Sequence, residues 1–400
     1  MRRVPMLPRP DWRQKCEQVG FTFYDMPSEN NEPYWRENAA YELSMAEVDT
    51  LEAETQELID RCLEAVNYAI THNRMEEFGI PKEFWPAITA SWQRKDPTVF
   101  GRFDLAWQPD GPAKLLEYNA DTPTSLIESS VVQWFWMKDM FGDTKDQFNS
   151  IHERLIAEWA AARTTHWRLP EGAPLHMASL RDNGDGVLLA EDYDNVAYMA
   201  EVAQAAGFKP QQLFIEDIGW SDQYQAFIDS QGKPIRSLYK LYPWEWLVHE
   251  AFAPHIISSQ QRTKWMEPLW KMLLSNKQLL VLLWELFPGH PNLLPAFNTD
   301  VPLLNKKRVR KPRLGREGAN VHIFEASGAL IESVAGGYGN EGHVWQEYVP
   351  LPTFDGWHAV IGSWIVGKEP AGIDFRETSG LVTGDMAFFV PHYINEPPAA

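Results

Sequence analysis

The sequence predicts an α+β or α/β enzyme with a nucleotide-binding lobe in its C-terminal third. Three patterns in the 400 residues indicate this class. Apolar side chains recur at helical spacing over about residues 43–72, and a strand–helix–strand order begins near residue 174. From Arg308 onward, short strand-like runs alternate with glycine-rich loops at 315–318 and 336–342. No internal repeat or low-complexity linker interrupts the sequence.

The first part of the chain is predicted to be mainly helical. The helix over about 43–72 has a periodic apolar face made of Leu51, Leu58, Ile59, Cys62, Leu63 and Val66. Ser44 and Glu47 at its start match a capping box, in which each side chain accepts a hydrogen bond from the other residue's backbone N–H. Residues 125–165 are again helical and rich in tryptophan. We therefore expect an N-terminal helical region that one β-hairpin interrupts.

That predicted hairpin, residues 100–124, carries the most informative polar residues. A turn centred on residues 110–111 brings four polar side chains together in two cross-strand pairs: Arg102 with Asn119 and Asp104 with Glu117. Because side chains alternate across a strand, all four then lie on one face.

The chemistry of these four side chains suits a phosphoryl-transfer site. Mg²⁺ favours a few carboxylate and amide oxygens and fills its other positions with water and phosphate oxygens. Arg102 would add fixed positive charge for a phosphoryl transition state. The alternative is a ladder of surface ion pairs on an ordinary hairpin.

Strands and helices alternate in the middle of the chain. The expected order is a strand at 175–180, a helix at about 191–206 that Gly207 ends, strands at 212–215 and 237–241, and helices over about 244–287. The most apolar run, 279–287, is short and contains Glu285, so we expect a buried helix and no membrane span.

Two lysines and a later strand indicate nucleotide binding. A predicted strand ends near Lys311 and is followed by the loop at 315–318, an arrangement in which an ammonium group and backbone N–H groups meet phosphates. Lys277 is a second candidate phosphate ligand, and residues 344–349 resemble an edge where backbone groups and Glu347 bind adenosine. The P-loop pattern GxxxxGK[ST] is absent. Each feature alone also fits a solvated strand end, so the prediction depends on their joint order.

The bulk composition excludes several classes of protein. The net charge of −19 disfavours nucleic acid or an anionic membrane as a partner, and 44% apolar residues indicate a globular fold. Cys16 and Cys62 lack metal-ligand spacing, so we expect a reducing, cytoplasmic compartment and no disulfide framework. The first residues contain no apolar run, so we expect no secretory signal.

Several motifs together resemble one family. In order over residues 100–380 they are RFD, EYNAD, NK, KPRLGREGAN, QEYV and GIDFRE. This order is similar to that of the glutathionylspermidine synthase family, in particular its short bacterial members described as acid–amine ligases. The segments RPDWRQK, EPYWRE, LYKLYPWEW, LLWELFPGHPNLLPAF and GSWIVG extend the resemblance over essentially the whole chain.

The resemblance implies an ATP-grasp synthetase fold for residues 1–400. It implies three sub-lobes: a helical region with the metal-binding hairpin at 1–170, a Rossmann-like pre-ATP-grasp lobe at 171–255 and the ATP-grasp nucleotide lobe at 256–400. We also expect no N-terminal amidase domain of the kind that the family includes, and therefore no hydrolysis of the product.

The resemblance also implies an activity, namely ATP- and Mg²⁺-dependent amide formation between a small acid and an amine through an acyl phosphate. The acid would be a small peptide or γ-glutamyl compound, and the amine a polyamine. An amino-acid or peptide ligase that uses no polyamine is one alternative. A non-catalytic, ATP-binding regulatory protein is the other.

The matching motifs assign roles to individual residues. The implied Mg²⁺ ligands are Asp104, Glu117 and Asn119, and the implied catalytic groups are Arg102 and Arg316. The implied ATP-binding residues are Arg102, Phe103, Asp104, Lys277, Lys311, Glu317, Gly318, Gln346, Glu347, Tyr348, Val349 and Leu381. The implied substrate-binding residues are Thr122, Thr124, Glu191, Asp192, Lys240 and Arg376.

Two departures from the family pattern concern the acid substrate. Thr122 and Thr124 flank Pro123 where serines are expected, and Leu241 follows Lys240 where a hydroxyl residue is expected. We therefore predict intact ATP handling and altered acid recognition. Acidic residues at 191 and 192 also fit an ordinary first helical turn, which favours negative charge.

Overall fold

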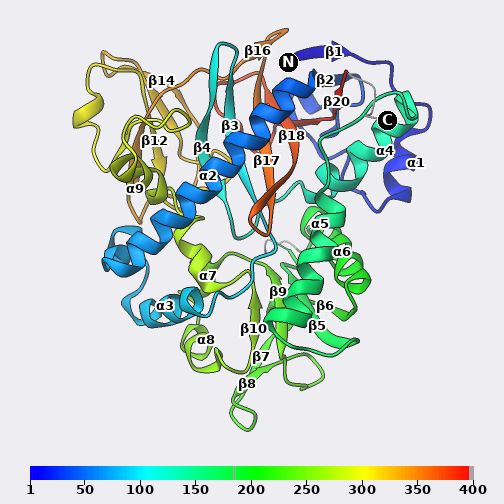
Figure 1. Ribbon diagram of the computed structural model, residues 1–400, viewed down its shortest axis with the longest axis vertical. Coiled ribbons are helices and arrows are strands. Elements are labelled where there is room, and N and C mark those ends of the chain that lie inside the picture. Colours follow the sequence, from blue (N-terminus) through cyan, green and yellow to red (C-terminus); the bar gives the residue numbers. More distant parts are fainter. Residues whose placement is uncertain (183, 185, 396–400) are drawn as a thin grey trace.

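The computed structural model describes residues 1–182, 184 and 186–395, which fold as a mixed α+β protein (Figure 1). Its helices are α1 (Trp12–Gln18), α2 (Met45–Thr71), α3 (Trp85–Gln93), α4 (Gln133–Phe141), α5 (Ile151–Ala161), α6 (Ala190–Ala205), α7 (Trp244–Leu247), α8 (Ala253–Ser259) and α9 (Gln278–Leu286). None of the helices in these described ranges is long and apolar enough to cross a membrane.

A central antiparallel sheet organises the molecule. Its strand order is β19 (Phe388–Val390), β18 (Glu369–Thr378), β17 (Trp357–Val366), β3 (Phe100–Gln108) and β4 (Gly111–Asn119), with β16 (Thr353–Phe354) paired to β17. Helix α2 lies across this sheet and contacts β4 and β18 (Figure 1). The sheet thus joins the early hairpin to strands from the end of the chain.

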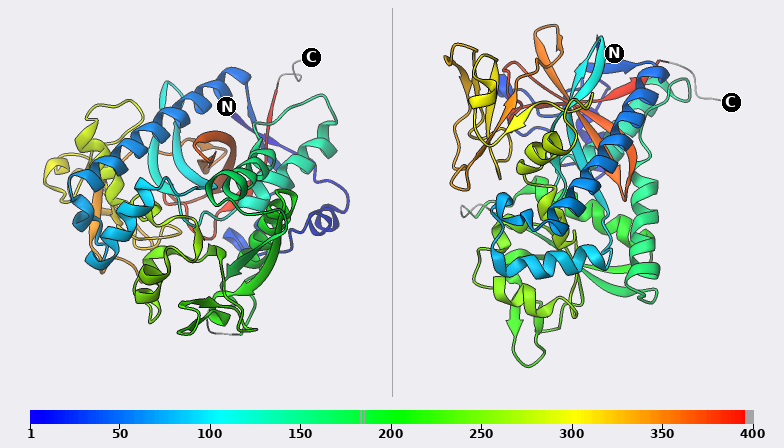
Figure 2. Two further views of the ribbon diagram at one scale, coloured as in Figure 1. Left: turned by 60° about the horizontal axis from the view of Figure 1, so that its bottom comes forward. Right: turned by 60° about the vertical axis from the view of Figure 1, so that its left-hand side comes forward.

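Two other sheets flank the central one (Figures 1 and 2). One is antiparallel, in the order β11 (Ala296–Phe297), β15 (His343–Glu347), β12 (Arg308–Pro312), β13 (His322–Phe324) and β14 (Leu330–Ser333). The other is parallel, in the order β10 (Lys264–Met266), β9 (Ser237–Leu241), β5 (Ala173–Ser179) and β6 (Phe208–Phe214), and α6 packs on it. Two small sheets complete the described strands: β1 (Arg2–Pro5), β2 (Ala39–Leu43) and β20 (His392–Ile394), and β7 (Gly219–Ser221) with β8 (Ala226–Ile228).

Helix α2 confirms the first predicted element. Ser44 and Glu47 form both hydrogen bonds of a capping box. The helix buries the apolar positions Val48, Leu51, Leu58, Ile59, Cys62 and Val66, while Leu63 is half-buried. Both cysteines of the chain are buried and free.

The middle of the chain differs from the prediction at two places. Strand β6 begins at Phe208, four residues before the predicted start, because parallel pairing with β5 recruits residues 208–211. Pro210 is tolerated there because β6 is the edge strand of its sheet. Residues 244–287 are not wholly helical, since strand β10 pairs in parallel with β9.

The hairpin pairs as predicted, although its turn lies one residue earlier than expected. The turn is at residues 109–110, and Gln108 pairs with Gly111. Two register shifts follow, each of which adds one residue to β4. Such bulges move the partner by one position each, so Asp104 still lies opposite Glu117 and Arg102 opposite Asn119. The sub-lobe boundaries at 170 and 255 stay predictions, and residues 396–400 of the third range lie outside the described part.

Candidate active site

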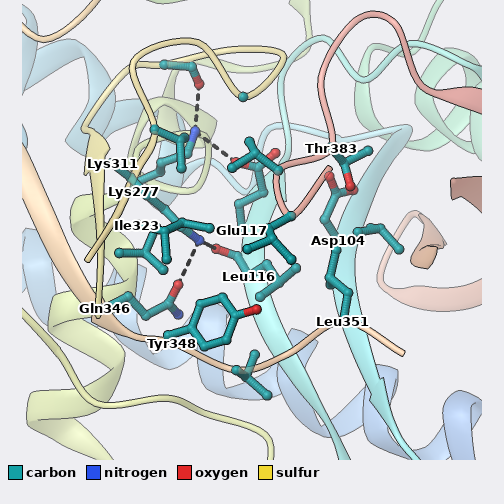
Figure 3. A pocket seen from close by; sticks show the side chains of 18 of the residues that line it. Asp104, Leu116, Glu117, Lys277, Lys311, Ile323, Gln346, Tyr348, Leu351 and Thr383 are labelled. Carbon is teal, nitrogen blue, oxygen red and sulfur yellow. Dashed lines mark hydrogen bonds and ion pairs between the residues drawn. The ribbon is translucent and has the colours of Figure 1, made fainter. Parts of the chain in front are cut away.

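Two cavities meet on the polar face of the hairpin. The first, here called the apolar pocket, lies between β4 and the sheet that contains β12 and β15 (Figure 3). The second is here called the polar cleft. Both cavities are lined by the same four residues at their junction, which are Asp104, Glu117, Gly318 and Thr383.

The apolar pocket combines aliphatic walls with two buried lysines, Lys277 and Lys311. Its walls include Leu116, Val309, Ile323, Leu351, Val360 and Leu381. Lys311 Nζ donates to Gln346 Oε1 at 2.7 Å and to the Leu116 carbonyl at 3.0 Å (Figure 3). Burial lowers the pKa of Lys311 to about 8, although Glu117 opposes the change. The pocket therefore places apolar side chains beside a lysine that loses its proton more readily than usual.

The second lysine of the apolar pocket contacts the junction residue Glu117. Lys277, the residue before α9, places Nζ 2.8 Å from Glu117 Oε2 and donates to the Gly315 carbonyl at 2.6 Å (Figure 3). Asn119 Nδ2 donates to Glu117 Oε1 at 3.0 Å. Burial alone would raise the pKa of Glu117, but Lys277 and Lys311 hold that pKa well below its usual range. Glu117 is therefore a carboxylate at all ordinary pH values.

Two arginines share the other carboxylate of the junction. Arg102 Nε donates to Asp104 Oδ1 at 3.0 Å, and Arg102 Nη1 donates to the Thr124 carbonyl at 2.6 Å. Arg376 places Nη2 2.6 Å from Asp104 Oδ2. The strong positive field of two guanidinium groups is thus held at the point where the cavities meet.

The polar cleft is also lined by two acidic residues, Glu191 and Asp192. Burial raises the pKa of Glu191 to about 7, with Asp192 and Glu317 adding repulsion. Burial also raises the pKa of Asp192 to about 6. Both residues lie in the first turn of α6. A cationic group placed here would restore the charged form of each carboxyl group.

The loop at 315–318 reaches across the cleft. Arg316 Nη1 donates to Thr122 Oγ1 at 2.9 Å, and its guanidinium lies 5.7 Å from the centre of the Trp246 ring. Gly318 has a φ of 68°, and a Cβ at this position would come within 2.8 Å of the Thr383 carbonyl oxygen. Glycine is therefore required where the loop touches the segment at 382–383.

Most residues named from the sequence line one of these two cavities. Those in the apolar pocket are Asp104, Glu117, Lys277, Lys311, Gly318, Gln346, Glu347, Tyr348, Val349 and Leu381. Those in the polar cleft are Arg102, Asp104, Glu117, Asn119, Thr122, Thr124, Glu191, Asp192, Arg316, Glu317, Gly318 and Arg376.

Phe103 and Lys240 line neither cavity. Phe103 is fully buried in the core against Tyr118, because it alternates with its neighbours on β3. Lys240 is also fully buried, and its Nζ lies 2.7 Å from Asp121 Oδ1. The next residue, Leu241, lines the cleft instead. The structure therefore gives the Lys240 ammonium an internal partner.

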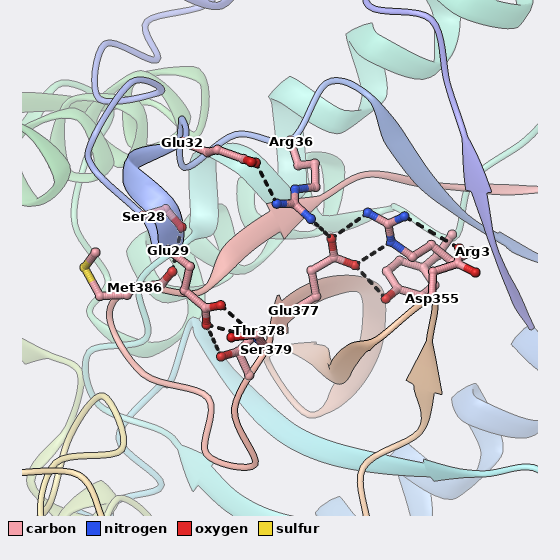
Figure 4. A network of polar contacts seen from close by, with 11 residues as sticks. Arg3, Ser28, Glu29, Glu32, Arg36, Asp355, Glu377, Thr378, Ser379 and Met386 are labelled. Atoms are coloured by element: carbon pink, nitrogen blue, oxygen red, sulfur yellow. Dashed lines mark hydrogen bonds and ion pairs between the residues drawn. The ribbon is translucent and has the colours of Figure 1, made fainter.

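Apart from Leu381, sequence reasoning missed the segment at 381–387, which borders both cavities. Glu332 accepts hydrogen bonds from the backbone N–H groups of Leu381 and Val382 at 3.0 and 3.2 Å. Glu29 accepts from the N–H of Ser379 at 2.9 Å (Figure 4). These anchors come from distant parts of the chain, so no local sequence pattern reveals them.

The junction has the chemistry that Mg²⁺ and a nucleotide require. Asp104, Glu117 and the amide oxygen of Asn119 form a hard oxygen donor set that leaves positions for water and phosphate oxygens. Residues 1–182, 184 and 186–395 contain no cluster of three or more His, Cys, Asp or Glu side chains that could hold a metal, so a site here would use two carboxylates and an amide. The apolar pocket beside the two ammonium groups suits a planar base joined to phosphates.

Known proteins match this chain over nearly its full length. Residues 3–395 match the glutathionylspermidine synthase pre-ATP-grasp family. A Haemophilus influenzae protein that bears the provisional name acid–amine ligase is 41% identical to this chain over 402 residues. The match covers 98% of this chain and 99% of that protein.

More distant relatives are longer proteins. Trypanothione synthetase of Crithidia fasciculata and the bifunctional glutathionylspermidine synthetase/amidase of Escherichia coli K12 are each 27% identical, over 82% and 78% of this chain. The matched region is 52% of the length of each relative, so the chain spans about half of them. Among solved structures, a glutathione synthetase-like effector from Globodera pallida superposes with a TM-score of 0.54 at 8% identity and covers 96% of both chains.

These relatives are ligases and synthetases, and the protein is an enzyme of the ATP-dependent carbon–nitrogen ligase class. Its fold is of the glutathione synthetase-like type. More specifically, the chain belongs to the glutathionylspermidine synthase pre-ATP-grasp family.

Proposed function

We propose that this protein joins a small acid to an amine in an ATP- and Mg²⁺-dependent reaction that proceeds through an acyl phosphate. The observation that carries the proposal is the meeting of the two cavities at Asp104 and Glu117. A phosphoryl donor in one cavity and a carboxylate in the other would then approach each other beside both arginines, which is the positioning that phosphoryl transfer requires.

The proposed nucleotide site uses the apolar pocket. Residues 346–349 would line the base, and Lys277 and Lys311 would exchange their present oxygen partners for phosphate oxygens. Asp104, Glu117 and Asn119 would hold Mg²⁺, which supplies neutralising charge for the phosphates. We also propose that residues 256–400 form the ATP-grasp lobe and 171–255 the pre-ATP-grasp lobe.

The proposed acid site lies beside the junction. Arg102 and Arg376 would pair with carboxylate groups, for which the planar guanidinium is well suited. Thr122 and Thr124 would add hydroxyl groups. This set favours a small, multiply charged acid such as a γ-glutamyl compound.

The proposed amine site is the part of the polar cleft that Glu191 and Asp192 line. Their carboxyl groups would attract a diamine or polyamine. A carboxyl group with a pKa of about 7, as at Glu191, is also suited to accept the proton that the ammonium group must lose before the neutral amine can attack. We expect the reaction to take place in the cytoplasm.

One specific observation favours substrates other than glutathione. Leu241 lines the cleft where a hydroxyl residue is expected, and the Lys240 ammonium is held by Asp121. Loss of one hydrogen bond to a buried substrate group costs about 1–3 kcal/mol, which corresponds to roughly tenfold or more in affinity. We therefore propose that glutathione with spermidine is a poor pair. An amino-acid or peptide ligase remains the second candidate.

The test is ADP release measured against a panel of acids and amines, with glutathione plus spermidine included. ADP release that depends on one acid and one amine together, with the amide detected by mass spectrometry, would support a ligase. Nucleotide binding without turnover for any pair would instead support the regulatory alternative. Efficient formation of glutathionylspermidine would overturn the argument from Leu241.

A further inference from the structure

A third carboxylate lies in the same row of the central sheet as Asp104 and Glu117. Asp374 on β18 pairs with Gly362 on β17, Gly362 pairs with Asp104 on β3, and Asp104 pairs with Glu117 on β4. Residues that pair directly across a sheet point to the same face. The row therefore places Asp374 on the face that forms the junction.

Gly362 leaves the space that Asp374 occupies. A Cβ on Gly362 would lie 2.3 Å from Asp374 Oδ1 and 2.6 Å from Oδ2, far closer than real Cβ atoms approach other atoms. A side chain at Gly362 would therefore displace the carboxylate.

One oxygen of Asp374 is firmly held and the other is not. Oδ2 accepts hydrogen bonds from Trp364 Nε1 at 2.7 Å and from Ser129 Oγ at 2.9 Å. Within the described part of the chain, Oδ1 is buried and has no hydrogen-bond partner. Asp374 itself is fully buried, and an unsatisfied oxygen in such a place is costly unless it gains a donor.

The matching donor belongs to Arg376, two residues further along the same face of β18. Its Nε is likewise buried without a hydrogen-bond partner among the described residues. Its Nη2 meets Asp104 Oδ2 at 2.6 Å. Burial raises the pKa of Asp374, although Arg102 and Arg376 oppose the change. An unsatisfied donor and an unsatisfied acceptor thus lie on the same face of β18, two residues apart.

Contacts on the opposite face of β18 hold its backbone in place. The next residue, Glu377, points to the opposite face, where it accepts hydrogen bonds from Arg3 Nε at 2.8 Å, Arg36 Nη1 at 2.7 Å and Tyr41 Oη at 2.9 Å (Figure 4). The strand therefore cannot shift easily. Any change in the partner of Arg376 must come from its side chain.

We propose that Asp374 is the positioning residue that receives Arg376 when Asp104 turns to bind Mg²⁺. This inference rests on the proposed function, because it takes Asp104 as a metal ligand. Asp104 now contacts one arginine through each of its oxygens. A cation that binds Oδ2 competes with Arg376 for that oxygen and weakens their contact. Asp374 Oδ1 then accepts from Arg376 Nε, so that the guanidinium stays at the junction and its Nη groups face the acid.

The first test follows the Nε–H signals of arginine by NMR in the full-length protein labelled with ¹⁵N-arginine. The Arg376 signal is assigned by its loss in R376K. Adding Mg²⁺ with AMP-PNP to the unmodified protein is expected to shift this signal downfield and slow its exchange with water. AMP-PNP without Mg²⁺ is expected to leave it unchanged. The Asp374→Asn variant keeps the size of the side chain and is expected to lose the Mg²⁺-dependent shift.

A second pair of variants tests the Asp374 carboxylate through the neighbouring residue Gly362. Gly362→Ala is expected to behave like Asp374→Asn, because its Cβ displaces Asp374. Gly111→Ala on the adjoining hairpin, where a Cβ would meet nothing within 4 Å, is the matched control and should behave like the unmodified protein. With the acid found in the substrate panel, Asp374→Asn should raise the KM for acid on the order of tenfold and leave the KM for ATP unchanged.

The outcomes separate this inference from the proposed function. A thermal shift with Mg²⁺ and AMP-PNP reports nucleotide binding independently of the arginine signals. Binding with an Arg376 response that persists in Asp374→Asn would overturn the inference alone. No binding at all would overturn the proposed function, and this inference with it.

Discussion

The low pKa of Lys311 predicts how ATP use depends on pH. Its ammonium is buried and has two neutral oxygen partners, at 2.7 and 3.0 Å, and its pKa is lowered from 10.5 to about 8. With that value, about nine-tenths of the free enzyme carries the charge at pH 7 and about one-tenth at pH 9. Because kcat/KM reports the free enzyme, kcat/KM for ATP should fall about tenfold between these pH values.

The same shift has the opposite effect on the stability of the free protein. The unfolded chain binds a proton at this lysine up to about pH 10.5, whereas the folded chain releases it near pH 8. Between these pH values the unfolded state binds more protons, so the contribution of Lys311 makes the folded state more stable as pH rises. ATP binding and stability should therefore change in opposite directions above pH 8.

The assay is ADP release at subsaturating ATP from pH 6.5 to 9.5, together with thermal unfolding in the same buffers. Lys311→Arg keeps its charge throughout this range and should flatten the profile at a lower absolute rate. Lys306→Met removes an exposed lysine that pairs with Glu347 at 2.7 Å and should leave the shape of the profile unchanged. A profile for the unmodified enzyme that is flat from pH 7 to 9 would refute the reasoning.

Three further predictions concern the metal, the loops and the acid. Glu117→Gln keeps the size of the side chain but removes one charge from the proposed Mg²⁺ site, so Mg²⁺-dependent ATP turnover should collapse while the fold survives by circular dichroism; near-normal turnover would contradict the assignment. The loops at 315–318 and 336–342, rich in glycine, should gain hydrogen-exchange protection with an ATP analogue, and equal protection with and without it would count against a lid. Arg376→Ala should abolish acid-stimulated turnover and leave the binding of an ATP analogue intact by calorimetry. Loss of nucleotide binding would show instead that Arg376 belongs to the nucleotide site.

The hairpin illustrates how far a sequence can predict a site. Alternation along two strands was enough to place Arg102, Asp104, Glu117 and Asn119 on one face, and the pairs formed as expected. The position of the turn was wrong by one residue, and two bulges in β4 restored the predicted pairing. Bulges depend on how the strand packs against the rest of the sheet, so spacing alone could not reveal them.

Other features depended on contacts between distant segments. Strand β10 forms because β9 offers it a parallel partner, and three residues have too little internal pattern to be recognised alone. Lys240 faces Asp121 and not the cleft, which is decided by the face of β9 that the core covers. Asp374 did leave a signal, since Asp374 and Arg376 are two residues apart in the GIDFRE motif and must share a face if that motif is a strand.

The common border of the two cavities has a consequence for inhibitor design. Asp104, Glu117, Gly318 and Thr383 line both cavities, so one molecule can extend from the apolar pocket into the polar cleft across this border. An adenosine analogue linked to a carboxylic acid would bind its second half at a high effective concentration, which adds affinity without any new contact. Such a compound would lose that advantage in enzymes whose nucleotide and acid pockets are separate, and the shared border thereby offers a basis for selectivity.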